Sequence, residues 1–203
     1  MRQPTLAVSA ILLAAGRSSR MGESVNKLLL PWGPVQVVEA VVDTILKAGL
    51  HELIVVVGHQ RELVAAAAKR EGVTIVANDQ FEEGLSTSIR AGLEIASASG
   101  YLFLPADMPC VKAATVRLVC ERLCRLGDGA IVLPAKDGRR GNPVGFSSSY
   151  REELLGLSGD RGARGLVAAH GEQVDLVDVD DDGIFQDLDT TMAYDELRRA
   201  FFS

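Results

Sequence analysis

The sequence predicts an α/β protein built on a single doubly wound, mostly parallel sheet with helices on both faces. Short runs of Val, Ile, Leu and Ala recur along the chain, and they are apolar throughout rather than alternating with polar residues. Longer segments with helical spacing separate these runs. Continuous apolar strands that alternate with helices are typical of a parallel sheet that is covered on both faces.

Strands and helices alternate through the first hundred residues. The strand segments are unbroken apolar runs, whereas the helical segments repeat apolar residues three or four positions apart. The first helix is expected to end at Gly49, and the third to begin with Ser86 near its N-cap. The expected strands are residues 6–14, 53–57 and 73–77, and the expected helices are residues 35–47, 62–70 and 86–98.

The second half begins with the same alternation and becomes less regular toward its end. An apolar run before Asp107 is expected to be a strand, and the segment that follows it has helical spacing. The expected strands are residues 101–105, 130–133, 144–146 and 174–179, and the expected helices are residues 113–125 and 192–201. Because no repeat, low-complexity tract or Ser/Pro-rich linker interrupts this pattern, we expect residues 1–203 to form one domain.

Composition excludes several classes of function. The chain has 203 residues, a net charge of −6 and 5% aromatic residues. Nucleic acids and anionic membranes normally require a basic face, so we expect neither as a partner. Three cysteines without metal-ligand spacing suit a reducing compartment. The apolar run near the N-terminus continues into Gly-Arg-Ser-Ser-Arg, unlike a signal peptide. We therefore expect a cytoplasmic protein.

The loop after the first strand has the composition of an anion site. It reads LAAGRSSRMG from residue 13, and Lys27 follows shortly after. Small residues let the backbone approach a phosphate, and successive N–H groups can form an anion-binding nest. Arg17, Arg20 and Lys27 add three cations to this short segment of an acidic protein. The spacing is neither that of a P-loop nor that of a dinucleotide-binding loop, and a generic glycine turn is the alternative interpretation.

Two further segments place polar groups at the same edge of the expected sheet. Asp107 comes directly after an apolar strand, where its carboxylate could hold Mg²⁺ or could simply shape a turn. Ser86, Thr87 and Ser88 begin a helix behind Gly84, where they could bind a nucleotide or could cap the helix. In an open α/β sheet, ligands bind beyond the carboxyl ends of the strands, so we expect these loops to line one crevice.

Six blocks of sequence, in order, resemble the molybdenum-cofactor nucleotidyltransferases. Within that family the chain is most similar to the molybdenum cofactor cytidylyltransferases, because the first loop contains Ala14-Ala15-Gly16 where GTP users tend to have Gly-Gly. The gap of four residues between Gly22 and Lys27 is about two longer than family members usually show. The blocks are LLAAGRSSRMG with NKLLLPWG, GLSTSIRAGL, PADMP, RGNPV, GDRGAR and DLDT.

The resemblance implies a Rossmann-like nucleotidyltransferase fold and a Mg²⁺-dependent enzyme. It would transfer CMP from CTP to the terminal phosphate of molybdopterin, release pyrophosphate, and supply a molybdoenzyme. The implied metal ligands are Asp107 and Asp189, and the implied catalytic residues are Arg17, Lys27 and Asp107. The implied nucleotide-binding residues are Leu13, Ala14, Ala15, Gly16, Arg17, Lys27, Gly84, Ser86 and Ser88, and the implied acceptor-binding residues are Arg140, Asn142 and Arg164.

Three alternatives remain open at this point. The enzyme could use GTP, or it could serve a sugar phosphate or polyol phosphate as acceptor. The chain could also be a non-catalytic carrier of molybdenum cofactor, which would bind its ligand tightly without consuming CTP. A pair of carboxylates for a metal favours the enzyme, because a carrier has no need of one.

Overall fold

The computed structural model describes residues 5–18, 21, 26–160 and 162–202. These residues form an eight-stranded sheet with the order β10-β7-β9-β6-β1-β4-β5, in which β8 pairs with β7. The strands are β1 (Leu6–Ala14), β4 (Leu50–Val57), β5 (Val73–Ala77), β6 (Gly100–Pro105), β7 (Ile131–Lys136), β8 (Arg139–Arg140), β9 (Val144–Ser147) and β10 (Val174–Asp178).

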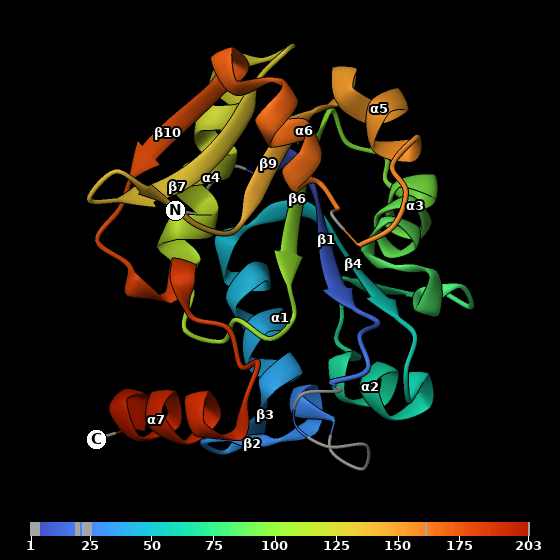
Figure 1. Cartoon of the computed structure of the whole chain (residues 1–203), viewed down its shortest axis with the longest axis vertical. Helices are drawn as coiled ribbons and strands as arrows, with labels where there is room; N and C mark the ends of the chain where they lie inside the picture. The colour runs from blue at the N-terminus through green and yellow to red at the C-terminus, as the bar shows by residue number, and fades with distance from the viewer. Residues whose placement is uncertain (1–4, 19–20, 22–25, 161, 203) are drawn as a thin grey trace.

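The sheet is mostly parallel, as the continuous apolar strands predict. β1 runs parallel to both β4 and β6, β4 runs parallel to β5, and β7 runs parallel to β10. β9 and the short β8 are the exceptions, because β9 lies antiparallel between β6 and β7 and β8 pairs antiparallel with β7. The chain winds outward from β1 in both directions, through β4 on one side and β6 on the other (Figure 1). A crevice is expected at such a switch point, beyond the carboxyl ends of β1 and β6.

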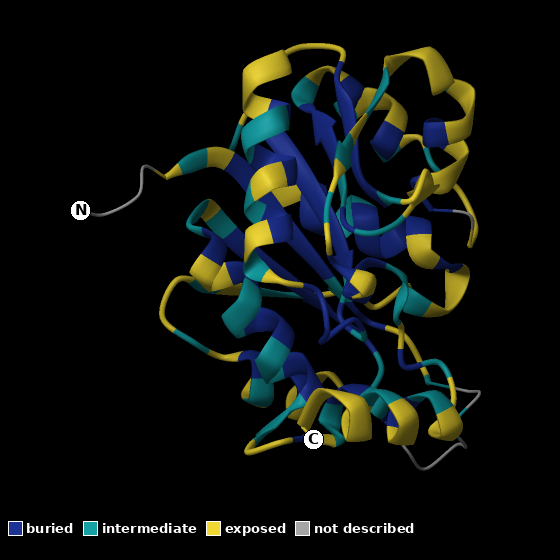
Figure 2. Ribbon diagram, turned by 90° about the vertical axis from the view of Figure 1, so that its left-hand side faces the viewer, coloured by how far each residue is buried: buried dark blue, intermediate teal, exposed yellow. Residues whose placement is uncertain are grey.

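Helices cover both faces of the sheet. Successive residues of β1 point to opposite faces, so that Leu12 lies in one apolar cluster and Ile11 in the other. The first cluster includes α1 (Val37–Ala48), α2 (Arg61–Ala68) and α4 (Ala113–Leu126), and the second includes α3 (Leu85–Ile95), α5 (Arg151–Leu155) and α6 (Arg164–Ala169). Figure 2 shows the buried strands between helices whose outer faces are exposed.

α3 begins at Leu85, one residue before the start that its sequence pattern predicts. Gly84, rather than Ser86, is the N-cap residue, and no side chain caps the helix. Gly84 has φ +114°, a conformation that side chains disfavour. A Cβ on Gly84 would also lie 2.6 Å from the carbonyl carbon of Gly159. The turn that begins α3 therefore depends on a glycine pressed against the 159–160 loop.

A hairpin and a closing helix complete the fold at the carboxyl edge of the sheet. The hairpin consists of β2 (Pro31–Trp32), which the sequence pattern did not predict, and β3 (Val35–Gln36), which was expected to belong to the first helix. Trp32 contacts the rings of Tyr194 and Phe201 on α7 (Thr191–Phe202). Within the described ranges, no helix is both long enough and apolar enough to cross a membrane.

Candidate active site

A crevice lies where the topology predicts it, between the ends of β1 and β6. Leu13 near the end of β1 and Pro105 at the end of β6 line a cavity of about 540 Å³. The first loop contributes Ala15, Gly16 and Arg17 to its wall, and the start of α3 contributes Gly84 and Ser88. Lys27 and Asp107 also line this cavity. Of the residues implied to bind the nucleotide, Ala14 and Ser86 do not line this cavity, and both are buried.

Lys27 joins the two carboxylates that the resemblance pairs as metal ligands. Its Nζ contacts Oδ2 of Asp107 and lies 2.8 Å from Oδ1 of Asp189. The Lys27 and Asp107 side chains are 15% and 13% exposed, and that of Asp189 is 36% exposed. Since both carboxylates touch one ammonium group, they are close enough to share a single cation, although 82 positions of sequence separate them.

Two backbone features place these carboxylates opposite each other. Asp107 follows β6, and the amide of Ala106 donates to the carbonyl of Leu13, which ties this loop to β1. The amide of Leu188 donates to the carbonyl of Asp107 at 3.0 Å, and this bond brings Asp189 to the site. Asp107 Oδ1 is buried and has no hydrogen-bond partner among the described residues. A buried carboxylate oxygen without a partner is energetically costly, so this atom is suited to an added cation.

Burial and the neighbouring charges together set the pKa values in this cluster. Burial alone would lower the pKa of Lys27, but the charges and hydrogen bonds of Asp107 and Asp189 outweigh it and raise the pKa. Lys27 is therefore a permanent cation at neutral pH. Burial, followed by the charges of Asp189 and Asp107, raises the pKa of the neighbouring Asp187. The single charge of Lys27 faces the two carboxylates of Asp107 and Asp189, so an added cation would offset the remaining negative charge.

The first loop turns its arginine toward α3 rather than toward the carboxylates. The guanidinium of Arg17 pairs with Glu82, and it lies 5.7 Å from the ring centroid of Phe81. The Ser18 hydroxyl accepts a hydrogen bond from the Lys27 amide at 3.1 Å, which fixes the return of the chain to the cavity. Arg20, the third cation of the expected cluster, lies outside the described residues.

The hydroxyl groups at the start of α3 have different surroundings. The Asn78 amide donates to Thr87 Oγ1 at 2.8 Å and to Ser88 Oγ at 3.0 Å. Thr87 is also within hydrogen-bond distance of the Gly84 carbonyl, so its hydroxyl is occupied by the fold. Ser88 lines the cavity although it is itself buried, whereas Ser86 and Thr87 do not line it. The three hydroxyls therefore do not act as one set, and Ser88 alone of them is available to a ligand in this cavity.

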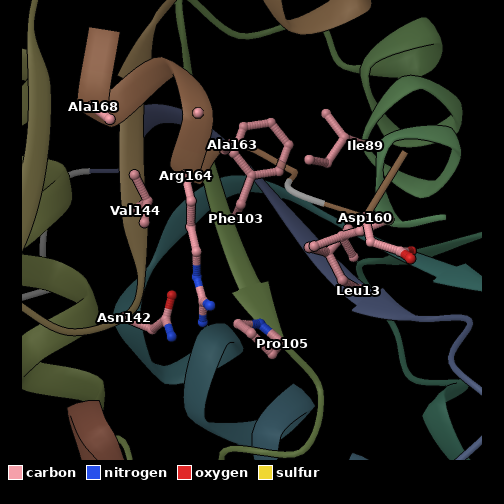
Figure 3. A pocket seen from close by; sticks show the side chains of 12 residues that line it. Leu13, Ile89, Phe103, Pro105, Asn142, Val144, Asp160, Ala163, Arg164 and Ala168 are labelled. Carbon is pink, nitrogen blue, oxygen red and sulfur yellow. The ribbon is translucent and has the colours of Figure 1, made fainter. Parts of the chain in front are cut away.

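The three residues implied to bind the acceptor come together beside the crevice. Arg140, Asn142 and Arg164 line one cavity of about 360 Å³. Asn142 and Arg164 also border a larger and mostly apolar cavity of about 610 Å³, which shares Leu13 and Pro105 with the crevice. In Figure 3 the Arg164 side chain extends into this cavity with its guanidinium beside the Asn142 amide. The Phe103 ring lies further along, near Ala163 and Ile89 (Figure 3).

Several residues of the crevice were missed by the sequence analysis. Phe81 and Glu82 line the cavity, and Asp160 borders both it and the larger apolar cavity. Phe81 and Glu82 lie in a short 3-10 helix just before Gly84, where no periodic pattern marks them. Asp160 belongs to the block GDRGAR, and its proximity to Gly84 was not evident from the sequence. Gly84 itself was a signal for this contact, because a glycine just before a helix indicates that another segment of backbone approaches closely.

Comparisons with known proteins agree on the family and differ on its activities. The chain is 32% identical to nicotine blue oxidoreductase of Paenarthrobacter nicotinovorans, over 90% of this chain and 92% of the relative. It is 32% identical to molybdenum cofactor cytidylyltransferase of Escherichia coli K12, over 68% and 69% of the two chains. It is 30% identical to purine catabolism protein PucB of Bacillus subtilis 168, over 98% and 99%.

Solved structures match the fold over nearly its full length. A nucleotidyl transferase from Methanothermobacter thermautotroptrophicus superposes with a TM-score of 0.84 and 29% identity, covering 96% of this chain and 97% of that one. The Rv0371c protein of Mycobacterium tuberculosis H37Rv, solved in complex with manganese, superposes with a TM-score of 0.80 and 29% identity, covering 95% and 98%. The fold and these neighbours define the class of protein, a nucleotidyltransferase. The chain belongs to the MobA-like NTP transferase domain family, whose model matches residues 10–174.

Proposed function

We propose that this enzyme transfers CMP from CTP to the terminal phosphate of molybdopterin, with Mg²⁺ bound by Asp107 and Asp189. One observation carries the proposal: Lys27, Asp107 and Asp189 meet beside a crevice lined by the first loop. Close to this crevice, sharing Leu13 and Pro105 with it, lies the cavity bordered by Asn142 and Arg164. The donor and the acceptor of a transfer reaction can therefore occupy neighbouring sites.

The residues present fit a hard divalent cation. Two carboxylates suit Mg²⁺, which keeps several waters and takes its remaining ligands from substrate phosphates. No group of three or more His, Cys, Asp and Glu residues suited to a metal ion exists among the described residues, so the rest of the shell would be water and phosphate. Bound there, Mg²⁺ would neutralise negative charge on the α-phosphate and acceptor oxygens.

The chain's own groups would position and neutralise the reacting phosphates. A phosphate oxygen of the acceptor attacks the α-phosphorus of CTP in line, the bond to the β-phosphate oxygen breaks, and pyrophosphate leaves with its electrons. The attacking phosphate is already an anion, so catalysis is mainly positioning and charge neutralisation. The first-loop amides and Lys27 would hold the leaving pyrophosphate. Arg17 would join them once it releases Glu82.

The preference for CTP rests on the first loop. Ala15 lines the crevice and is 4% exposed, so its methyl group takes up space that a glycine would leave empty. A pyrimidine needs less room than a purine, which favours CTP over GTP. Replacement of Ala15 by glycine is expected to improve the use of GTP relative to CTP.

The preference for molybdopterin over a sugar phosphate rests on the larger cavity. Phe103, Ile89 and Val144 give it an apolar surface, and Arg164 adds a cation at one side. A flat heterocycle that carries a phosphate matches this combination better than a polyhydroxylated sugar does, because an apolar wall leaves sugar hydroxyls without partners. We propose the cytoplasm as the compartment, where the three free cysteines would stay reduced, and a molybdoenzyme as the recipient of the product.

Pyrophosphate release with purified protein tests the proposal. Mg²⁺, CTP and molybdopterin together are expected to give pyrophosphate release. No release is expected when GTP replaces CTP or when a sugar phosphate replaces molybdopterin. Asp107→Ala is expected to lower the turnover about 10²–10³-fold or more, without recovery at high Mg²⁺. Near-normal turnover of that variant would refute the role of Asp107.

The relative named as an oxidoreductase supplies a second arm for the same assay. Turnover of nicotine blue by the protein, with no release of pyrophosphate under any condition, would favour that relative's activity. CTP binding without consumption would favour a carrier. The proposal predicts neither result, because a pair of carboxylates that can hold Mg²⁺ serves phosphoryl transfer rather than electron transfer.

A further inference from the structure

The acidic run at residues 180–182 divides into two kinds of carboxylate. A run of acidic residues normally indicates a solvated surface. Asp180 and Asp182 are exposed, and each lies 2.9 Å from Nζ of Lys136. Asp181 is only 2% exposed, although Asp is rarely buried this completely. Asp181 therefore has a task that its neighbours do not share.

Three hydrogen bonds surround the Asp181 carboxylate. Oδ2 accepts from the amide of Lys112 at 2.9 Å and from Oγ1 of Thr115 at 2.6 Å. Oδ1 accepts from the amide of Gly183 at 3.0 Å. Lys112 is the N-cap residue of α4 and makes no capping bond with its own side chain. Asp181 thus caps a fourteen-residue helix from a distant segment, where the helix dipole favours its charge.

The segment that this carboxylate anchors is residues 181–189. It contacts the loop that carries Asp107 and the loop that carries Asn142. A Cβ on Gly183 would lie 2.2 Å from the carbonyl oxygen of Cys110, so the segment is pressed against the loop after β6. The amide of Asn142 donates to the carbonyl of Ile184 at 2.9 Å. The amide of Leu188 donates to the carbonyl of Asp107 at 3.0 Å, and Asp189 follows directly.

We propose that Asp181 is a positioning residue for nucleotidyl transfer, one that sets the placement of Asp189 and of Asn142 together. The inference rests on the proposed function and deepens it by adding a residue outside the crevice. The same short segment carries Asp189 and supports the Asn142 loop, so a shift at its anchor displaces a metal ligand and an acceptor contact at once. The nucleotide contacts of the first loop and of α3 do not pass through it.

Asp181→Asn is the direct test. Both oxygens of Asp181 accept hydrogen bonds from donors, so an amide must turn its NH₂ toward a donor in either orientation. We expect Mn²⁺ affinity and the KM for the acceptor each to worsen about tenfold or more, as loss of an orienting contact behind a metal ligand typically does. CTP binding measured without metal is expected to stay within about twofold of the wild type. Electron paramagnetic resonance measures the affinity for Mn²⁺, and isothermal titration calorimetry measures the affinity for CTP.

Matched variants separate positioning from a general loss of structure. Asp180→Asn removes the same charge from the same run and is expected to leave all three parameters unchanged. Thr115→Val removes one of the three donors, whereas Thr115→Ser keeps the hydroxyl, so the first is expected to resemble Asp181→Asn in part and the second to resemble the wild type. Proportional loss of Mn²⁺, acceptor and CTP binding in Asp181→Asn would overturn the proposal.

Amide hydrogen exchange tests the same idea without metal or substrate. The amides of Leu188 and Asn142 are expected to lose protection in Asp181→Asn and to keep it in Asp180→Asn, while the core amides of β1 stay protected in both. Unchanged protection at Leu188 and Asn142 would refute the anchor, whatever the activity. Loss of protection in a protein that never releases pyrophosphate would instead leave the anchor standing and remove the proposed function.

Discussion

Lys27 is placed where a divalent cation is expected, and this leads to a prediction opposite to that for an ordinary active-site residue. Its ammonium touches both Asp107 and Asp189, so a metal ion must compete with it for the two carboxylates. We therefore expect Lys27→Met to bind Mn²⁺ more tightly than the wild type in the absence of nucleotide, while turnover falls about 10²–10³-fold.

The magnitude follows from the contacts that a metal would have to break. A hydrogen bond between charged groups contributes about 1.5–3 kcal/mol, which corresponds to about 10- to 150-fold in affinity. Asp189 is 36% exposed, so solvent screens its share of the interaction. We therefore expect the lower end, about tenfold tighter Mn²⁺ binding in the variant.

Bound nucleotide should reverse the difference in Mn²⁺ affinity between the wild type and Lys27→Met. Triphosphate oxygens attract Lys27 away from the carboxylates and supply metal ligands themselves, so CTP is expected to tighten Mn²⁺ binding to the wild type more than to Lys27→Met. Titration of Mn²⁺ by electron paramagnetic resonance, with and without CTP, measures both effects. Lys136→Met is the matched control, because its ion pairs with Asp180 and Asp182 lie outside the crevice. Nucleotide-free Lys27→Met that binds Mn²⁺ no better than the wild type would refute the competition.

Three further predictions concern stability and the two cavities. Arg122 donates two hydrogen bonds of 2.7 Å to Asp175 and so lowers the pKa of that carboxyl. Asp175→Asn should therefore reduce the free energy of unfolding by about 1 kcal/mol at pH 7, and the difference should vanish as pH falls through the depressed pKa. Gly84→Ala should cost about 1–3 kcal/mol because of its positive φ and the contact with Gly159, and it should weaken CTP binding. Ala168→Phe, which narrows the apolar cavity, should raise the acceptor KM about tenfold or more and leave the CTP KM unchanged.

Each of these outcomes has a control and a contradicting result. Urea unfolding of Asp175→Asn is followed from pH 7 to a pH below the depressed pKa, and a difference in the free energy of unfolding that persists at the acid end would contradict the prediction. Gly165→Ala places a methyl group within α6 where no atom lies within 4 Å, so it should be at least as stable as the wild type in scanning calorimetry. Equal stability of Gly84→Ala and the wild type would contradict the steric argument. Ala66→Phe on the exposed face of α2 controls for added surface, and an unchanged acceptor KM in Ala168→Phe would exclude the apolar cavity as the acceptor site.

The sheet and its crevice were predictable because they depend on local patterns. Continuous apolar runs specify buried parallel strands, and the rule for open sheets places ligands beyond their carboxyl ends. Asp107 follows such a run directly, so its place at the ligand edge could be predicted from the residues alone. The antiparallel insertion of β9 between β6 and β7 could not, because a strand of four residues shows no direction in its pattern.

That residues far apart in the sequence meet at the site could be predicted only from the resemblance to a known family. Nothing near Asp189 distinguishes it from Asp187, and its position depends on a backbone bond between Leu188 and Asp107. The pairing of Arg17 with Glu82 was missed because an exposed ion pair leaves no trace in spacing. The burial of Asp181 was missed for the opposite reason, since an acidic run normally indicates a solvated surface.

The two proposed metal ligands are held by different means, and this bears on how the site could work. Asp107 lies two residues beyond the end of β6, a central strand, in a turn that the Ala106 amide ties to β1, so its position is set by the sheet. Asp189 ends an irregular segment whose attachment depends on Asp181 and on the bond from Leu188. A cation placed between them therefore draws on one fixed ligand and one that the 181–189 segment must deliver. Since the same segment supports Asn142, metal binding and acceptor binding should be coupled through it, and each should strengthen the other.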